Sequence, residues 1–246
     1  MKQKYLNAQI VKREDVTSDL FKLWLMPEGG KQFIFKPGQY CTIGLPAEDR
    51  SRIIWRPYSI VSAPHEEHIE FFIELVPPPK GNLTPLLYKL KIGDGVSLLP
   101  KAKGVFTFEP KYRNQVIVAT VTGIAPFMSM IRSLSDATKK EHGFFVLHGA
   151  SYSDEFGYMK ECQDFTRGGW DFNYVPTVSS PREERNKLWG RQTGRVNEIL
   201  EEYLGQWTIP QHNTIVYACG HPGMIADVKK RLAPKGWKVK EEKYWK

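Results

Sequence analysis

The sequence predicts a two-domain protein in which an antiparallel β-barrel is followed by an open α/β domain with a parallel sheet. Residues 1–110 contain short alternating or apolar runs separated by glycine and proline turns, which is typical of antiparallel strands. After residue 110 such runs alternate with helical patterns, and this alternation indicates a parallel sheet. The length of 246 residues allows one to two domains. We therefore expect domains at 1–110 and 111–246.

The expected elements follow from the period of the apolar residues and from the turn signals between them. In the first domain we expect strands at 5–11, 20–26, 39–45, 55–62 and 69–76, with turns at 27–30, 36–38 and 93–95 and a short helix at 84–90. In the second domain we expect strands at 115–120, 143–148, 170–178 and 214–219, and helices at 127–134, 155–165, 196–204 and 222–232. Because open α/β sheets bind ligands beyond the carboxyl ends of their strands, candidate site residues should follow these strands.

Composition and charge exclude several classes of protein. Apolar residues make up 41% and charged residues 25% of the chain, which is typical of a soluble globular protein. The 35 basic and 27 acidic residues leave a net charge of +8, which indicates an acidic partner. The cysteines Cys41, Cys162 and Cys219 are scattered, which argues against disulfides and against a metal or iron–sulfur site. With no apolar run of membrane-spanning length and no signal sequence, we expect a cytoplasmic protein.

The tetrapeptide Arg56-Pro57-Tyr58-Ser59 lies inside an otherwise apolar strand. One interpretation is an edge strand, where proline is tolerated and polar side chains face water. The other is a flavin site, in which Arg56 pairs with a diphosphate, Tyr58 lies against a flat ring and the Ser59 hydroxyl reaches a ring nitrogen.

A second candidate, Gly81-Asn82-Leu83-Thr84, ends a proline-rich loop and begins a helix. Thr84 is expected to cap this helix, and the same geometry would suit a diphosphate, so the two interpretations can hold together.

Two strand-to-helix connections in the second domain carry small residues that would let a ligand approach the backbone. The first contains Thr122, Gly123, Ile124, Ala125 and Pro126, and the second contains Cys219, Gly220 and His221. Cys219 is either a small buried residue or a thiol beside a reactive carbon, and His221 is expected to be a turn residue. His148 lies at no spacing typical of a nucleophile–base pair or a metal site.

The remaining candidates lie in the charged loop after the third strand and at the chain end. Ser179, Arg182, Arg185 and Arg195 form either a solvated loop or a site for an isolated phosphate. Tyr244 and Trp245 form either a surface-packed tail or an aromatic cover for a flat cofactor.

Taken in order, the motifs RPYS, GNLT, TGIAPF and CGHP and the aromatic end resemble the ferredoxin–NADP reductase family, most closely its bacterial flavodoxin/ferredoxin reductases. The resemblance covers nearly the whole chain. It implies a ferredoxin reductase-like fold in which the barrel binds FAD and the α/β domain binds NADP(H). Two positions depart from the family pattern: Val121 stands where a glycine is frequent, and Ser151 stands where many members carry an arginine.

The family's roles carry over only to the matching positions of this chain. The resemblance implies that Tyr58, Ser59 and Cys219 flank the reacting rings. It assigns FAD to Arg56, Pro57, Tyr58, Ser59, Gly81, Leu83 and Thr84, with Tyr244 or Trp245 as a cover. It assigns the nicotinamide nucleotide to Thr122, Gly123, Ile124, Ala125, Pro126, Cys219 and Gly220, and a 2′-phosphate to Arg182, with Arg185 or Ser179 as further candidates. Arg195 lies in a stretch that resembles the TGR segment of the same group.

The implied activity is that of an FAD-dependent oxidoreductase, a ferredoxin/flavodoxin–NADP+ reductase. Such an enzyme exchanges hydride with NADP(H) and single electrons with an acidic ferredoxin or flavodoxin, and we expect a monomer. Rival hypotheses are the reductase component of an oxygenase, a free flavin reductase and, in another class, a basic nucleic-acid-binding protein. The spread of basic residues over both domains disfavours nucleic acid.

Overall fold

The structure is a computed structural model that describes residues 6–243. It divides into two compact units, and each is described by itself. The first contains the chain up to Thr107 together with Ala125–Ser133, and the second contains Phe108–Ile124 and the chain from Leu134 onward. Among the described residues, no helix is both long and apolar enough to cross a membrane.

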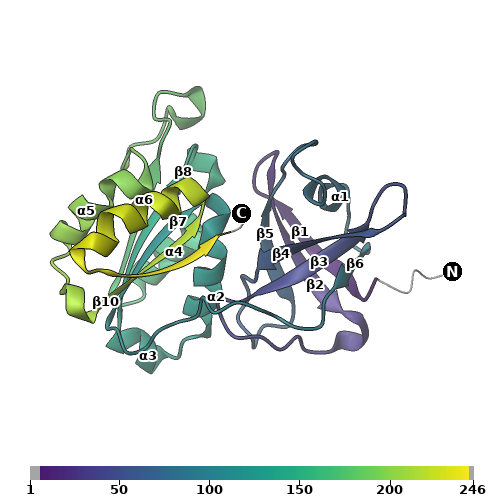
Figure 1. Ribbon diagram of the computed structural model, residues 1–246, viewed down its shortest axis with the longest axis horizontal. Helices are drawn as coiled ribbons and strands as arrows, with labels where there is room; N and C mark the ends of the chain where they lie inside the picture. The colour runs from purple at the N-terminus through teal and green to yellow at the C-terminus, as the bar shows by residue number, and fades with distance from the viewer. Residues whose placement is uncertain (1–5, 244–246) are drawn as a thin grey trace. The chain divides into compact units, whose positions relative to one another are not determined.

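The first unit is built on a six-stranded antiparallel sheet with the order β4-β3-β6-β1-β2-β5 (Figure 1). Its strands are β1 (Ala8–Asp15), β2 (Leu20–Pro27), β3 (Tyr40–Pro46), β4 (Ile53–Ser59), β5 (Ile69–Glu74) and β6 (Gly95–Leu98), with one short helix, α1 (Thr84–Tyr88). Just beyond β4, the Val61 N–H donates to the Glu70 carbonyl of β5 at 2.9 Å. This bond joins the two ends of the strand order, so the predicted barrel is confirmed.

The barrel forms because alternate residues of its strands are apolar and point inward. The buried cluster includes Ile10, Phe21, Leu23, Leu25, Ile43, Phe71, Ile73, Leu83 and Leu87. Strand β6 was not among the expected strands. It has only four residues and follows the turn at 93–95 directly, so it is too short to show a period of its own.

The second unit contains a five-stranded parallel sheet with the order β11-β10-β7-β8-β9. Its strands are β7 (Asn114–Thr120), β8 (Gly143–Ala150), β9 (Phe172–Val178), β10 (Thr214–Gly220) and β11 (Lys238–Lys243). The helices between them are α2 (Ala125–Ser133), which packs with the first unit, α3 (Asp136–Glu141), α4 (Met159–Arg167), α5 (Val196–Gln206) and α6 (Pro222–Leu232). The predicted parallel α/β sheet is confirmed.

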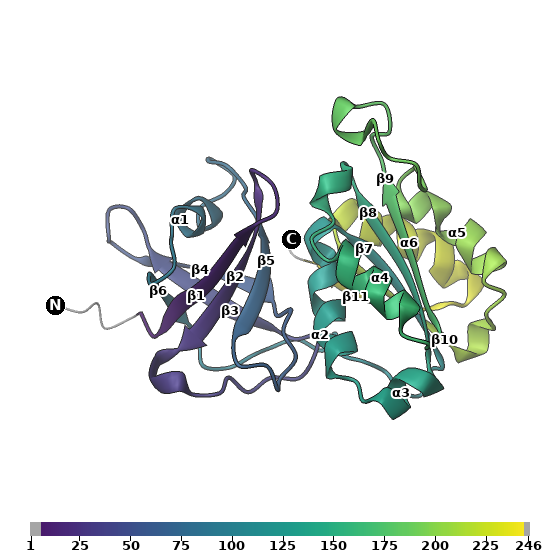
Figure 2. The ribbon, with the colours of Figure 1, turned by 180° about the vertical axis from the view of Figure 1, so that it is seen from behind.

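Both faces of this sheet are covered, as parallel sheets require. Figure 1 shows α5 and α6 on one face, and Figure 2 shows α4 on the opposite face. The α5/α6 side buries Val116, Val118, Leu147, Leu200, Val216, Ile225 and Val228. The other side contains an aromatic cluster in which the rings of Phe144 and Trp170 meet edge to face at 5.5 Å.

Strand β11 was not expected, because its sequence KVKEEK is almost entirely charged. It pairs in parallel with β10 at the edge of the sheet, where one side of the backbone has no strand partner in the sheet order. Charged side chains are common on edge strands because they discourage pairing with other chains. Only Val239 of this strand packs against the α5/α6 core, so the apolar signal is a single residue.

Helix α2 is held on the barrel by two polar contacts. The Ser129 hydroxyl donates to the Ser62 carbonyl at 2.8 Å, and Arg132 Nη1 lies 2.5 Å from Glu70 Oε2. Glu70 is 2% exposed, so its carboxylate is shielded from water where it meets Arg132. A buried carboxylate of this kind depends strongly on its cationic neighbour.

We expect Arg132→Met to lower the free energy of unfolding by about 3 kcal/mol, because it removes the guanidinium that forms an ion pair with the buried Glu70 carboxylate. Adding Glu70→Gln to that variant should recover most of the loss, since the buried negative charge is then removed as well. Denaturant unfolding of the two single variants and the double variant measures this coupling. Additive losses in the double variant would show that the pair does not stabilise α2.

Candidate functional site

The turn after β7 passes very close to the end of β10. Thr120 ends β7, a 3₁₀ turn spans Val121–Ile124, and α2 begins at Ala125. A Cβ atom on Gly123 would lie 2.2 Å from the Cys219 carbonyl oxygen, which is far inside contact distance. Only glycine therefore fits here, and the turn rests with its backbone directly on the backbone of β10.

The end of β10 approaches the end of β7 just as closely. Gly220 has a φ of +123°, and a Cβ atom there would lie 2.1 Å from Thr120 Oγ1. That hydroxyl oxygen accepts the His221 N–H at 2.8 Å. We call residues 120–124 and 219–221 the interlocked turns. His221 Nδ1 accepts the Gly223 N–H at 3.1 Å, so His221 is the N-cap of α6.

Val121 holds a strained conformation within the interlocked turns. Its φ is +41°, a left-handed value that is unusual for a β-branched residue and costs on the order of 1–3 kcal/mol. Its carbonyl oxygen accepts a hydrogen bond from Nε2 of His148 on β8, at 2.9 Å. The other ring nitrogen, Nδ1, lies 3.1 Å from the Tyr174 hydroxyl on β9.

The protonation state of His148 follows from these partners. Burial lowers the pKa of His148 to about 4, although the bond to the Val121 carbonyl works in the opposite direction. The ring is therefore neutral near pH 7. Because a carbonyl only accepts, the single proton lies on Nε2, and Nδ1 accepts the Tyr174 hydroxyl proton. The strands β7, β8 and β9 thus hold the strained Val121 carbonyl in place through His148. The spacing of residues in the sequence did not indicate this role of His148.

The structure brings the residues predicted to bind the nicotinamide nucleotide together at the carboxyl edge of the parallel sheet. Thr122, Gly123 and Ile124 lie in the turn beside Cys219 and Gly220, while Ala125 and Pro126 continue as the first residues of α2. Cys219 is fully buried, as its interpretation as a small core residue requires. Its role beside a reactive ring stays a prediction.

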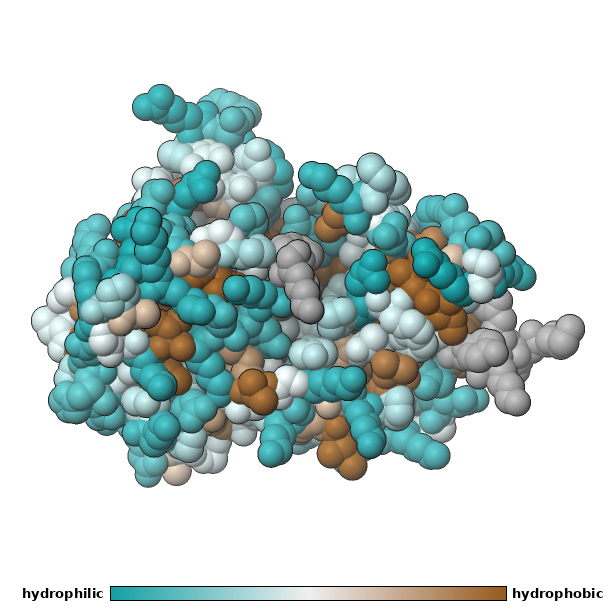
Figure 3. All heavy atoms as spheres, in the orientation of Figure 1, coloured by the Kyte–Doolittle hydropathy of each residue, from teal (hydrophilic) through white to brown (hydrophobic). Residues whose placement is uncertain are grey.

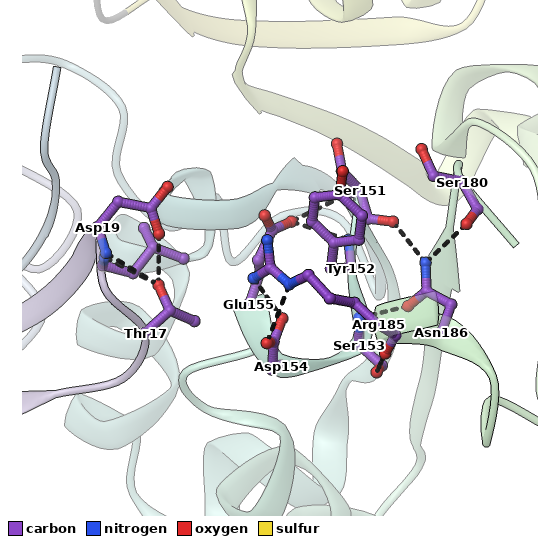
Figure 4. Close-up of polar contacts among 11 residues, drawn as sticks. Thr17, Asp19, Ser151, Tyr152, Ser153, Asp154, Glu155, Ser180, Arg185 and Asn186 are labelled. Carbon is purple, nitrogen blue, oxygen red and sulfur yellow. Dashed lines mark hydrogen bonds and ion pairs between the residues drawn. The ribbon is translucent and has the colours of Figure 1, made fainter. Parts of the chain in front are cut away.

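A second group of candidates lies where the loops after β8 and β9 meet (Figure 4). Buried Asn186 joins the two loops, since its Oδ1 accepts the Ser153 N–H at 2.8 Å. Its Nδ2 donates to the carbonyls of Ser151 at 2.9 Å and Ser180 at 2.8 Å. Asn186 therefore fixes both loops as one rigid feature, which we call the two-loop cluster (residues 151–155, 180 and 185–186).

Charged groups of the two-loop cluster are paired with each other although they remain exposed to solvent (Figure 4). Arg185 forms a fork with Asp154: Nη2 lies 2.7 Å from Oδ1, and Nε lies 3.2 Å from Oδ2. Its guanidinium also lies 3.9 Å from the centre of the Tyr152 ring. Glu155 Oε2 accepts the N–H groups of Ser151 and Tyr152, and burial raises the pKa of this carboxyl.

The other residues predicted for a phosphate are also exposed. Ser179 and Arg182 lie in the loop after β9, and Arg195 immediately precedes α5. The structure therefore separates Arg185, which already has an acidic partner, from Arg182 and Arg195. Sequence reasoning treated these arginines alike because an ion pair between loops that lie 31 residues apart leaves no local pattern.

In the first unit, the RPYS motif lies on β4, at one end of the strand order. Arg56 and Tyr58 share one face of this strand, because side chains alternate. Arg56 and Pro57 are exposed, and the Arg56 guanidinium donates to the Trp55 carbonyl at 2.8 Å. Burial raises the pKa of the Tyr58 hydroxyl, against the pull of the Arg56 charge. Ser59 is 6% exposed.

The predicted helix cap at Thr84 is wrong. Thr84 is the first residue of α1, and its hydroxyl is bonded to Val76, donating to the carbonyl at 3.1 Å and accepting the N–H at 3.0 Å. Gly81 is required at its position, because a Cβ atom would lie 1.7 Å from the Val76 carbonyl oxygen. Leu83 is buried in the barrel core. A diphosphate role for these residues stays a prediction.

The aromatic residues Tyr244 and Trp245 lie outside the described residues. Just before them, Glu242 of β11 is a residue that sequence reasoning missed. It pairs in register with Cys219, and its buried Oε2 has no hydrogen-bond partner among residues 6–243. Burial raises the pKa of Glu242 to about 7. Its only sequence signal is alternation along a charged strand.

We expect His148→Phe to lower the free energy of unfolding by about 2 kcal/mol, because the ring volume is kept while both hydrogen bonds are lost. Tyr174→Phe removes only the outer bond and should cost about 1 kcal/mol. Denaturant unfolding with coincident probes measures both changes. Equal losses in the two variants would show that the bond to Val121 contributes nothing.

Glu242 predicts a pH dependence of stability. Its pKa in the folded state, about 7, is higher than the ordinary value of 4.5, so the folded protein holds this proton more tightly than the unfolded chain. Stability is therefore full below pH 4.5, falls as the pH rises and reaches its lower level above pH 7. Glu242→Gln should match the wild type at pH 4.5 and exceed its unfolding free energy at pH 8, by at most about 3 kcal/mol. Parallel pH profiles would contradict this expectation.

Comparison with known proteins divides the chain in the same order. Residues 7–105 match the family model of the oxidoreductase FAD-binding domain, and residues 117–230 match that of the oxidoreductase NAD-binding domain. A crystal structure of a ferredoxin NADP+ reductase from Neisseria gonorrhoeae, with bound FAD and NADP, has a TM-score of 0.83 and 21% identity. It covers 99% of this chain and 100% of its own, which shows a shared fold.

Two curated relatives extend the similarity to sequence. The flavodoxin/ferredoxin–NADP reductase of Buchnera aphidicola subsp. Schizaphis graminum is 28% identical, over 98% of this chain and 99% of its own length. The ferredoxin–NADP reductase of Pseudomonas aeruginosa is 30% identical, over 83% of this chain and 81% of its own length. The chain therefore belongs to the ferredoxin–NADP reductase family.

Proposed function

We propose that this protein exchanges hydride with NADP(H) and single electrons with ferredoxin or flavodoxin, using bound FAD. The observation that carries this proposal is the pair of interlocked turns. They leave bare glycine backbone at the carboxyl edge of a parallel sheet, which is where such sheets bind nucleotides. A barrel with an exposed arginine on β4 completes the proposed set of cofactor residues.

The barrel residues fit the flavin cofactor. Arg56 is exposed on β4 and can exchange its bond to the Trp55 carbonyl for the stronger bonds that a diphosphate accepts. Tyr58, on the same strand face, would lie against the ring system, and its protonated hydroxyl keeps that surface neutral. Ser59 would supply a hydroxyl near the ring nitrogen. Pro57 and the Gly81–Thr84 segment would border this site.

The α/β residues fit the nicotinamide nucleotide. Gly123 and Gly220 have no side chain that could keep a ligand from the backbone, and Thr122, Ile124, Ala125 and Pro126 would line the approach. Cys219 lies beneath, fully buried, where it would give the reacting ring a small apolar support. We propose this domain at 111–246 and the flavin domain at 1–110, with Tyr244 or Trp245 as a cover for the flavin.

Bound flavin can exchange electrons in pairs or one at a time, which links a nicotinamide nucleotide to one-electron carriers. The protein's own residues then have to bind the flavin and the nucleotide, orient their rings and exclude water from them. The interlocked turns are largely buried, which helps to exclude water, and hydride exchange needs no acid–base pair from the protein. His148, neutral and fixed, contributes by holding the Val121 carbonyl in position.

Charge and surface character support the proposed partner. The net charge of +8 would steer an acidic carrier toward the protein. On the face drawn in Figure 3, hydrophobic residues gather only in small separate patches, which supports a monomer. The cysteines Cys41, Cys162 and Cys219 are buried and form no disulfide within residues 6–243, which supports a reducing, cytoplasmic location.

The purified protein should be yellow and should reduce an artificial electron acceptor when NADPH is added. We expect Gly123→Ala to lower kcat/KM for the nucleotide at least tenfold, because its Cβ would collide with the Cys219 carbonyl. FAD content should not change. Gly205→Ala is the matched control, since a Cβ there meets nothing within 4 Å. A colourless protein that takes up no FAD would contradict the proposal.

A further inference from the structure

The two-loop cluster follows β8, the strand next to β7 in the sheet. In nucleotide-binding sheets of this kind, the residue after the neighbouring strand meets the adenosine ribose: an acidic residue contacts a 2′-hydroxyl, and an arginine accommodates a 2′-phosphate. Asp154 and Arg185 both lie in this cluster. How the site distinguishes NADPH from NADH therefore depends on the pair of Asp154 and Arg185. This inference rests on the proposed function.

Arg185 is committed to Asp154 in this structure. The fork of two bonds, at 2.7 and 3.2 Å, uses one edge of the guanidinium, and the Tyr152 ring covers its face at 3.9 Å. The backbone on each side is fixed as well, because the Arg185 carbonyl accepts the Ser153 hydroxyl at 3.1 Å and Asn186 is buried. To bind Arg185, a 2′-phosphate must therefore displace the Asp154 carboxylate from the guanidinium.

The charges around this pair favour a hydroxyl over a phosphate. The cluster contains the carboxylates of Asp154 and Glu155 and one guanidinium, that of Arg185. A 2′-phosphate carries up to two negative charges, so displacing Asp154 would leave like charges side by side. A 2′-hydroxyl needs no displacement and can donate to a carboxylate, as in other dinucleotide sites. Ser151, which is uncharged, adds no compensating cation.

We propose that Asp154 is a specificity-determining residue, which holds Arg185 and so reduces the preference of the nucleotide site for NADPH over NADH. The pair is partly exposed, with 41% and 51% of the two side chains accessible, so a phosphate can compete for it. Asp154 lowers selectivity without abolishing the use of either nucleotide.

The test compares the FAD-loaded wild type with Asp154→Asn. Releasing Arg185 and removing one negative charge should raise kcat/KM for NADPH about tenfold, with that for NADH within about twofold of the wild type. A second readout needs no turnover: calorimetric titration should show adenosine 2′,5′-bisphosphate binding about tenfold tighter, with AMP unchanged. Asp164→Asn is the matched control, because Asp164 forms a similar exposed pair with Arg167 at 3.2 Å, on α4.

The double variant Asp154→Asn/Arg185→Ala separates the two residues. If Asp154 acts through Arg185, replacing Asp154 in the Arg185→Ala background should change the NADPH/NADH ratio by less than about threefold. An unchanged ratio in Asp154→Asn, or equal changes for both nucleotides, would overturn the inference while leaving the proposed function intact. A protein that contains FAD but binds neither adenosine phosphate would overturn the proposed nucleotide site itself, and this inference with it.

Discussion

The close approach of two backbones at the carboxyl edge of the parallel sheet is the constraint on which the rest of the second unit depends. Gly123 lies against the Cys219 carbonyl, and Gly220 lies against the Thr120 hydroxyl, with no room for a methyl group at either place. Because packed interiors do not yield to an added atom, these two contacts fix the positions of β7 and β10 relative to each other. The starts of α2 and α6 follow from them.

The glycines are also the reason why the turns at the carboxyl edge of the parallel sheet could be predicted from the sequence. Small residues directly after a buried strand are typical of a turn where a ligand or a second backbone comes close, so positions 120–126 and 219–222 could be identified from residue types alone. The strands of the barrel were predictable for a similar reason, since alternation along β2 and β5 is carried by large apolar residues such as Phe21 and Phe71. The expected boundaries of β1 and β4 differ from the observed ones by two to four residues, as happens where strands fade into turns.

Features that depend on long-range pairing could not be predicted in this way. β11 is a strand because β10 offers it an edge, and its own residues are charged. His148 looks like any histidine in an apolar strand until its two ring nitrogens are seen against Val121 and Tyr174. Likewise, the pairing of Arg185 with Asp154 requires two loops to be joined by Asn186. In each case the deciding contact spans many residues, so no short pattern records it.

The strained Val121 turn has a consequence for the order in which the chain can fold. An isolated segment would avoid a φ of +41° at a β-branched residue, so the turn has no local reason to form early. Its stabilising partner, His148, reaches the Val121 carbonyl only after β8 has paired with β7, and the ring is steadied further once β9 brings Tyr174. The proposed nucleotide-binding edge thus depends on three assembled strands, and a fragment containing only β7 and its turn would lack the bonds that steady the Val121 carbonyl.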